Sequence, residues 1–144
     1  MTRFSDAKGR KVVSTSTADT VGKVNDFVVD PSSRSVLAVL CKKTESGEVL
    51  RWSDITAFGD DAVTVSGPEQ IGEADEQVSE LLGKDHQVLG KRVLSTHGAD
   101  VGKVTDVEFD HESGAIENLV LGNETIGGSR LLGVGSYAVV VRLD

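Results

Sequence analysis

An internal repeat constrains this chain more than any other feature of its sequence. Three segments of the first half recur in the second: GRKVVST at 9–15 as GKRVLST at 90–96, VGKVNDFVVD at 21–30 as VGKVTDVEFD at 101–110, and FGDDAVTV at 58–65 as VGSYAVVV at 134–141. In the second pair, six of the ten residues are identical. The offset between copies falls from 81 to 76, as expected where turns absorb deletions. The 144 residues are therefore expected to fold as two similar units.

Each copy alternates valine-rich segments of strand length with turn-forming residues. Strands are expected at 11–15, 23–29, 35–42, 48–53 and 62–66, and at 92–96, 103–110, 115–121, 129–132 and 137–143, with turns at DPSS, ESGE, FGDD, HESG and ETIGG. Such short units cannot make a large sandwich, whereas closure into a barrel removes exposed strand edges. The sequence predicts an all-β protein of two tandem small antiparallel barrels, at residues 1–67 and 88–144.

The segment between the copies, residues 68–87, is predicted to be an acidic linker with one short helix. Residues 68–89 carry a net charge of −5, against 0 for residues 1–67 and −3 for residues 90–144. The helix is expected over Ala74–Leu82, with Asp75 and Glu76 in its first turn and Gly83 as its C-terminal cap. It either lies against a barrel or binds a partner.

Charge and composition exclude several functions. A net charge of −8 disfavours direct nucleic-acid binding, which depends on Lys and Arg. The longest apolar run, Val36–Cys41, is too short to span a membrane, and no apolar signal-peptide core is present. We expect a cytoplasmic protein. One cationic cluster remains, and it either converges into a patch or consists of solvated strand edges: Arg10, Lys11, Lys42, Lys43 and Arg51.

Recognisable catalytic and metal-binding patterns are missing from the sequence. Cys41 lies in an apolar strand, and His86, His97 and His111 have no metal-ligand spacing. We expect no enzyme activity, metal or cofactor, although a hydrolase that uses His97 or His111 stays an alternative. Gly22 and Gly102 are expected at tight turns or close backbone approaches. The residues four positions after them, Asp26 and Asp106, are expected to accept backbone hydrogen bonds.

The motifs GRKVV, VGKVNDFVVD, VLAVL, RWSDI and FGDDAVTV, in this order, resemble the PRC-barrel family. The second copy keeps GKRVL, VGKVTDVEFD and IENLVL, but has GGSRLLGVG in place of RWSDI. The resemblance implies a six-stranded β-barrel that serves as a non-catalytic binding module, as in photosynthetic reaction-centre H subunits and a ribosome maturation factor.

Together these features suggest a protein-binding adaptor or scaffold. Its partner would be a ribosomal protein, a membrane-associated complex or a cell-division component, and a homodimer is compatible with the sequence. The alternative is an accessory factor in ribosome or RNA maturation, in which the lysine cluster contacts RNA. The candidate protein-binding residues are Trp52, Phe27, Phe58, Lys42 and Lys43, and the three aromatic residues have a core role as the alternative.

Overall fold

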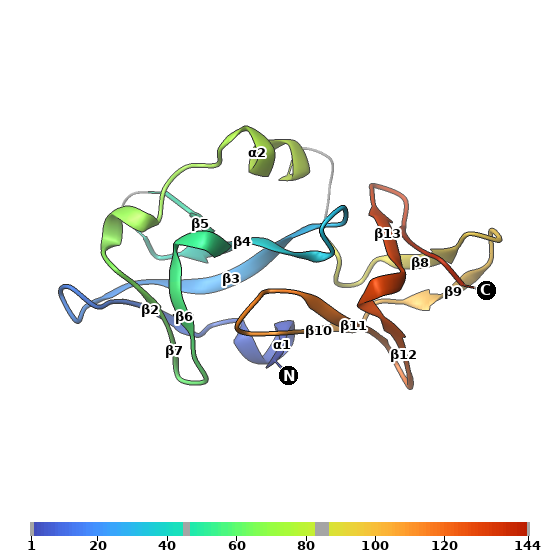
Figure 1. Ribbon diagram of the computed structural model, residues 1–144, viewed down its shortest axis with the longest axis horizontal. Coiled ribbons are helices and arrows are strands. Elements are labelled where there is room, and N and C mark those ends of the chain that lie inside the picture. Colours follow the sequence, from blue (N-terminus) through green and yellow to red (C-terminus); the bar gives the residue numbers. More distant parts are fainter. Residues whose placement is uncertain (1, 45–46, 83–86, 144) are drawn as a thin grey trace.

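The computed structural model describes residues 2–44, 47–82 and 87–143, and most of its regular structure is β-strand (Figure 1). The first half contains one six-stranded sheet in the order β5-β4-β3-β2-β7-β6. Its strands are β2 (Lys11–Ser14), β3 (Thr20–Asp30), β4 (Ser35–Lys42), β5 (Val49–Arg51), β6 (Ile55–Phe58) and β7 (Ala62–Val65). The pair β2–β7 is parallel, and the other pairs are antiparallel.

The expected closed barrel is wrong for this half, because no ladder of the described residues joins the outermost strands β5 and β6. A single 3-10 turn, η1 (Trp52–Asp54), connects these two strands. The turn takes the backbone out of strand geometry directly after the three residues of β5, and the sheet stays open between β5 and β6. Consequently the expected strand at 48–53 ends at Arg51.

The second half forms two four-stranded sheets, β1-β10-β11-β12 and β13-β14-β8-β9. Its strands are β8 (Arg92–Ser95), β9 (Asp100–Lys103), β10 (Asp106–Phe109), β11 (Ile116–Leu121), β12 (Glu124–Gly127), β13 (Leu131–Val134) and β14 (Val139–Val141). The turn η3 (Gly128–Arg130) matches η1 of the first half. Two expectations fail here, since ETIGG is mostly strand β12, and much of 129–132 is the η3 turn.

The sheet of the second half divides because the hairpin between β11 and β12 is tight. Leu121 pairs with Glu124 across the two residues Gly122 and Asn123, whereas six residues separate β4 from β5. This four-residue difference accounts for the drop of the repeat offset from 80 to 76. In the first half β4 continues to Lys42, which pairs with Lys23. Because β11 turns back before the corresponding position, β9 and β10 belong to separate sheets.

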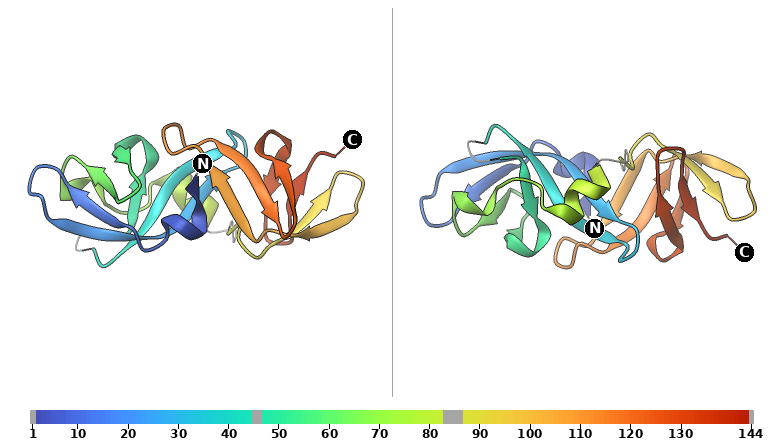
Figure 2. Two further views of the ribbon diagram at one scale, coloured as in Figure 1. Left: turned by 90° about the horizontal axis from the view of Figure 1, so that it is seen from below. Right: turned by 90° about the horizontal axis from the view of Figure 1, so that it is seen from above.

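The N-terminal segment crosses from the first half to the second. Strand β1 (Thr2–Arg3) pairs with β10, and the short helix α1 (Phe4–Ala7) follows it. Figure 2 places the N-terminus in the middle of the molecule, between the two halves. The carboxylate of the buried Asp106 accepts hydrogen bonds from the Ser5 hydroxyl and from the Ser5 backbone N–H. Residues 2–7 thus bind to the repeat that is distant in sequence.

The halves meet through equivalent hairpins at residues 30–35 and 110–115. Ser35 forms a bridge with Ala115, its counterpart at an offset of 80. Val36 N–H donates to the Gly114 carbonyl at 2.8 Å, and Ile116 N–H donates to the Arg34 carbonyl at 2.9 Å. Such reciprocal contacts between equivalent positions indicate approximate twofold symmetry.

One hydrophobic core runs through both halves and is centred on stacked aromatic rings. Phe4 stacks on Phe27 with centroids 4.1 Å apart, and Phe109 lies 5.5 Å from each of these rings. Phe4 and Phe109 are buried together with Phe27, although the three residues come from widely separated parts of the sequence. Each half therefore supplies part of the apolar interior of the other.

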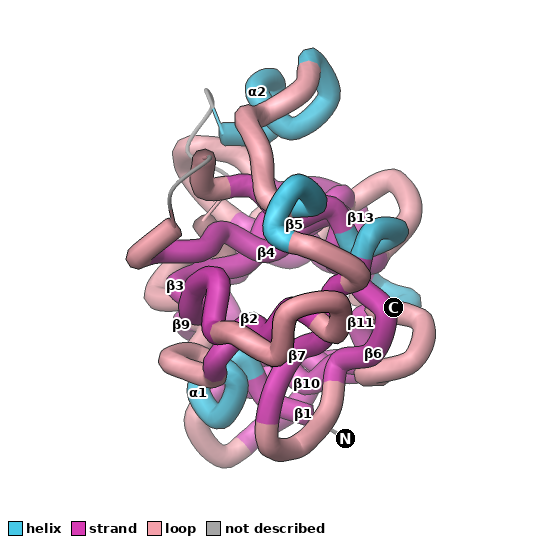
Figure 3. Tube along the Cα trace, turned by 90° about the vertical axis from the view of Figure 1, so that its left-hand side faces the viewer, coloured by secondary structure: helices cyan, strands magenta, loops and turns pink. Residues whose placement is uncertain are grey.

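The expected linker helix is confirmed as α2 (Glu76–Leu82), which begins two residues later than expected. Asp75 precedes it and accepts a hydrogen bond from Val78 N–H at 2.9 Å, as an N-terminal cap does. Val78 is fully buried in a small cluster with Val28, Ala38 and Val49. Through this cluster the helix packs on the outer face of β3–β5, and Figure 3 shows it at the top of the view, above β4 and β5. The expected cap Gly83 lies outside the described residues.

Candidate functional site

The predicted aromatic anchor lies mostly inside the protein. Phe27 is 5% exposed and Phe58 is 3% exposed, whereas Trp52 is half-buried. Trp52 stacks on Phe58 with centroids 5.5 Å apart, and it meets Phe109 edge-on at 6.0 Å. These rings therefore join the two halves, and the binding role of the three aromatic residues stays a prediction.

Trp52 lies against the hairpin of the second half at Gly114, which has a φ of +79°. A β-carbon at Gly114 would lie 2.9 Å from Cε2 of Trp52, so a side chain has no room there. At the contact related to this one by the approximate twofold axis, Arg34 occupies the position that corresponds to Gly114. Gly128 occupies the position that corresponds to Trp52. Arg34 Nε donates to the Leu131 carbonyl at 2.7 Å. In one contact the turn supplies the large residue, Trp52, and the hairpin supplies Gly114. At the symmetry-related positions the hairpin has the large residue, Arg34, and the turn has Gly128.

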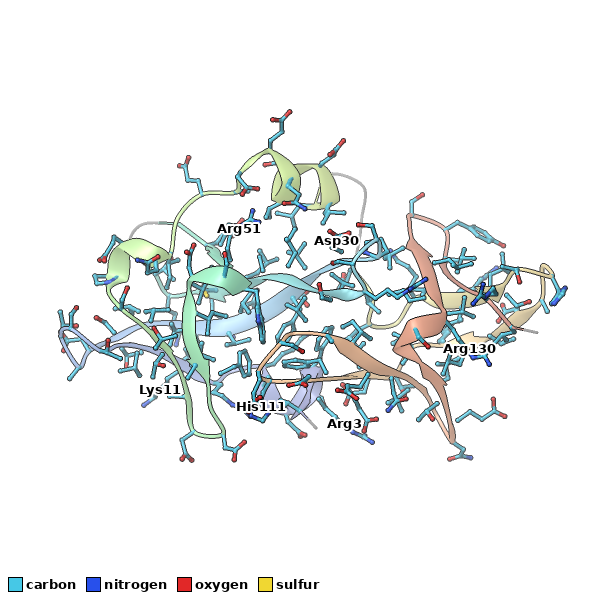
Figure 4. The ribbon with its side chains drawn as sticks, viewed as in Figure 1. Arg3, Lys11, Asp30, Arg51, His111 and Arg130 are labelled. Atoms are coloured by element: carbon cyan, nitrogen blue, oxygen red, sulfur yellow. The ribbon has the colours of Figure 1, made fainter. Side chains whose placement is uncertain are left out.

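A hollow adjoins Trp52, and it is lined by Thr56, Phe58, Gly59, His111 and Glu112, among others. Figure 4 shows His111 on the hairpin beside β6. Above Phe58, the Arg10 guanidinium lies 5.5 Å from the ring centroid and donates to the Gly59 carbonyl at 2.8 Å. Of the other histidines, His97 lies 2.9 Å from the Leu143 carbonyl, and His86 is outside the described residues.

The lysine candidates lie elsewhere, at the end of β4. Lys42 and Lys43 are exposed and line a second hollow together with Asn25 and Glu73. The cationic cluster converges in part, since Lys11 pairs with Lys23, and Lys23 pairs with Lys42 across adjacent strands. Arg51 points to α2 and forms an ion pair with Asp75. Lys42 and Lys43 are therefore separate from Trp52, so the five predicted residues do not form one site.

A surface that the sequence analysis missed lies on the outer side of β8, β13 and β14. We name it the C-terminal face, and it consists of Leu94, Leu132, Gly133, Tyr137 and Val140. Leu132 is 44% exposed and Tyr137 is 67% exposed, which makes them, with Leu82, the large apolar residues exposed in the described part of the chain. A shallow hollow spans this face from Leu94 to Tyr137.

The first half offers an internal comparison for this face. At the offset of 76, Thr56, Asp61 and Thr64 occupy the positions of Leu132, Tyr137 and Val140. The backbone is equivalent, because both hairpins pair in the same register and both carry a bulge at Thr56 or Leu132. At these three positions the surface is thus polar in the first half and apolar in the second. The composition of the face is therefore independent of the strand pairing that forms it.

Tyr137 is held in place by Arg92. The Arg92 guanidinium lies 5.1 Å from the Tyr137 ring centroid, and its Nη1 donates to the phenol oxygen at 2.8 Å. Asp100 Oδ2 lies 3.6 Å from Arg92 Nε. This chain of contacts fixes an exposed tyrosine, so a partner would lose little side-chain entropy on binding it. A sequence signal existed, since SYA replaces DDA in the aligned repeat.

The remaining candidates for chemistry have structural environments. Cys41 is buried, and burial raises the pKa of its thiol to about 11, which keeps it protonated and poorly nucleophilic. Asp26 and Asp106 accept hydrogen bonds from the backbone N–H groups of Phe27 and Val107, as expected. Gly22 lies in a strand, where a β-carbon would meet Thr44, so close approach rather than a turn explains it.

Comparison with known families identifies the chain. The PRC-barrel domain model matches residues 1–71 and again residues 83–142. The protein therefore belongs to the PRC-barrel family and contains two such domains in tandem. No curated protein matches the sequence. Within the described residues, every helix is too short or too polar to cross a membrane.

Proposed function

We propose that this protein is a non-catalytic binding module whose C-terminal face docks on another protein. The exposed Leu132 and Tyr137, at positions where the first repeat has Thr56 and Asp61, carry the proposal. Exposed apolar surface on a folded domain commonly marks an interaction site. PRC-barrel domains commonly mediate protein interactions, which agrees with this role.

The chemistry of the face fits a partner with an apolar or aromatic surface. Tyrosine and arginine are enriched among residues that dominate binding energy, and Arg92 holds Tyr137 in one orientation. Leu94 and Val140 pair on adjacent parallel strands and line the same hollow as Tyr137, and Gly133 adds no side chain beside Val140. A side chain of the partner would fit into the hollow between them.

The test uses the first repeat as its control. A photo-crosslinking amino acid placed at position 137 in cells should give a specific crosslinked product. The same amino acid at position 61, its counterpart, should give none. The crosslinked protein is then purified and its affinity measured for the wild type and for Leu132→Thr/Tyr137→Asp/Val140→Thr, which carries residues of the first repeat.

We expect this triple variant to fold, as judged by circular dichroism, and to lose at least tenfold in affinity. Thr56→Ser/Asp61→Asn, a conservative change on the matching face, should bind like the wild type. Equal affinity for the triple variant and the wild type would disprove the proposed face. Equal crosslinking from positions 61 and 137 would show that contact is not specific to the second repeat.

A further inference from the structure

Lysines lie side by side across three strands on the outer face of the first half. Lys11, Lys23 and Lys42 occupy consecutive cross-strand positions on β2, β3 and β4, and Lys43 follows them; we name these four residues the lysine row. Their neighbours Val12, Val24 and Cys41 are buried in the core, so the lysines point outward. Figure 4 shows Lys11 at the outer edge of the molecule.

The lysine row is electrostatically unfavourable within the isolated chain. Like charges directly opposite each other destabilise a pair of strands. None of the ion pairs between described residues involves the row, although the protein has 23 acidic residues. No ion pair between described residues offsets this cost, which favours an anionic group supplied by a partner.

The second repeat differs from the first in two ways at the positions that correspond to the lysine row. Its corresponding pair, Arg92 and Lys103, has an acid beside it, because Asp100 contacts Arg92 where the first repeat has Thr20. Its tight hairpin also removes the positions that correspond to Lys42 and Lys43. The lysine row therefore depends on the longer hairpin of the first repeat.

A complementary row of acids lies on the linker. Glu73, Glu76 and Glu80 are exposed, and none of them forms an ion pair among the described residues. Glu76 and Glu80 are four residues apart on α2, which places their β-carbons about 5–6 Å apart. Adjacent strands of the lysine row are spaced at about 4.8 Å. The two rows therefore match in spacing and have opposite charge.

We propose that the lysine row binds the acidic segment 73–80 of a second copy of this chain. Within one copy, Val78 holds α2 on β3–β5. Glu73 lines the hollow beside Lys42 and Lys43, but these described lysines and glutamates form no ion pair with each other. Between copies each surface has its complement. Single exposed ion pairs contribute at most about 1 kcal/mol, so several are needed, and the association is expected to be weak and weakened by salt.

Charge exchange tests this self-association, with sedimentation of the full-length protein over a range of concentrations. We expect reversible association at low salt that is lost at high salt. Lys23→Glu/Lys42→Glu and Glu76→Lys/Glu80→Lys should each fail to associate alone. An equimolar mixture of the two variants should associate again, because each row then meets its opposite charge in the other variant.

Lys103→Glu/Arg142→Glu is the matched control, since it changes the net charge by the same amount outside the row. It should associate at least tenfold more strongly than Lys23→Glu/Lys42→Glu. A monomeric wild type at every concentration and salt would overturn the proposal, as would a mixture that fails to associate. Salt-sensitive binding of single-stranded oligouridylate by a monomeric wild type, lost on Lys23→Glu/Lys42→Glu, would assign the row to RNA instead.

Discussion

The two repeats share their strand pairing but differ in what they expose. In the first, β3 runs unbroken for eleven residues and holds six strands in one sheet. In the second, the equivalent strand divides into β9 and β10, and the C-terminal face is apolar. A hairpin longer by four residues gives the first repeat the last two lysines of its row, Lys42 and Lys43, and three substitutions give the second its apolar face. The difference teaches that duplication supplied two scaffolds, whose surfaces then diverged.

The strongest test of this comparison removes the ring that both repeats share. Phe109→Ala should cost about 3–5 kcal/mol of unfolding free energy, the usual range for a buried phenylalanine. Phe109 contacts Phe4 and Phe27 from outside its own repeat, so both halves should lose stability together. Urea unfolding followed by Trp52 fluorescence and by circular dichroism should give coincident transitions. Separate transitions would show that the repeats unfold independently.

A smaller loss of unfolding free energy is expected at the contact between Trp52 and Gly114, where the two repeats differ in side-chain size. Gly114→Ala places a β-carbon against Trp52 at a positive φ. Gly98 has a similar φ of +80° but open space around it, so Gly98→Ala measures the backbone cost alone. We expect Gly114→Ala to be more destabilising by about 1–3 kcal/mol, the range for overpacking. Equal unfolding free energies for the two variants would contradict the contact with Trp52.

The equivalent aspartates should differ more modestly. Asp106 binds the N-terminal segment through Ser5, whereas Asp26 faces Lys8 at 3.9 Å. Hydrogen bonds to a charged group contribute about 1.5–3 kcal/mol, so Asp106→Ala should destabilise more than Asp26→Ala. A double-mutant cycle of Asp106→Ala with Ser5→Ala, measured by urea unfolding, isolates the coupling energy between these two residues. Additive effects in the cycle would show that Ser5 and Asp106 are not coupled.

The smallest effect is expected at the helix that covers only the first repeat. The Val78 N–H hydrogen bond and the Arg51 charge hold the pKa of Asp75 below its ordinary value of 3.8. A lowered pKa stabilises the fold above pH 3.8, and this contribution is lost as pH falls through the lowered pKa. Asp75→Asn should therefore speed hydrogen exchange in α2 at neutral pH and have less effect in acid. A pH-independent difference from the wild type would disprove this role.

Much of the fold could be predicted because a repeat supplies each pattern twice. Strand segments, the DPSS and HESG turns and the linker helix followed from alternation and spacing. Among the described residues the expected closed barrels are absent, because the turn at Trp52 interrupts the first sheet and the short hairpin after β11 divides the second. Composition does not reveal these backbone turns. The crossing of residues 2–7 was also missed, since pairing over a separation of 107 residues, Thr2 with Phe109, leaves no local signal.

The candidate site was harder to predict than the fold. Sequence reasoning weighed Trp52, Phe27 and Phe58 because aromatic residues favour interfaces, yet the same residues favour cores, and two of the three are buried. No local pattern marks Tyr137 as exposed, because it lies in a turn whose counterpart in the first repeat holds the two aspartates Asp60 and Asp61. Comparing the repeats position by position, rather than for identity, would have found the C-terminal face.

The strand that crosses between the repeats also affects the order in which the protein can be completed during synthesis. Residues 2–7 leave the ribosome well before their partner strand β10, which ends at Phe109. Domains normally begin to fold as they emerge, but here Phe4 must wait for most of the chain before it is covered. The first repeat is therefore expected to stay open at its aromatic centre until the second has been translated, so a stalled or truncated chain would expose these rings to chaperones.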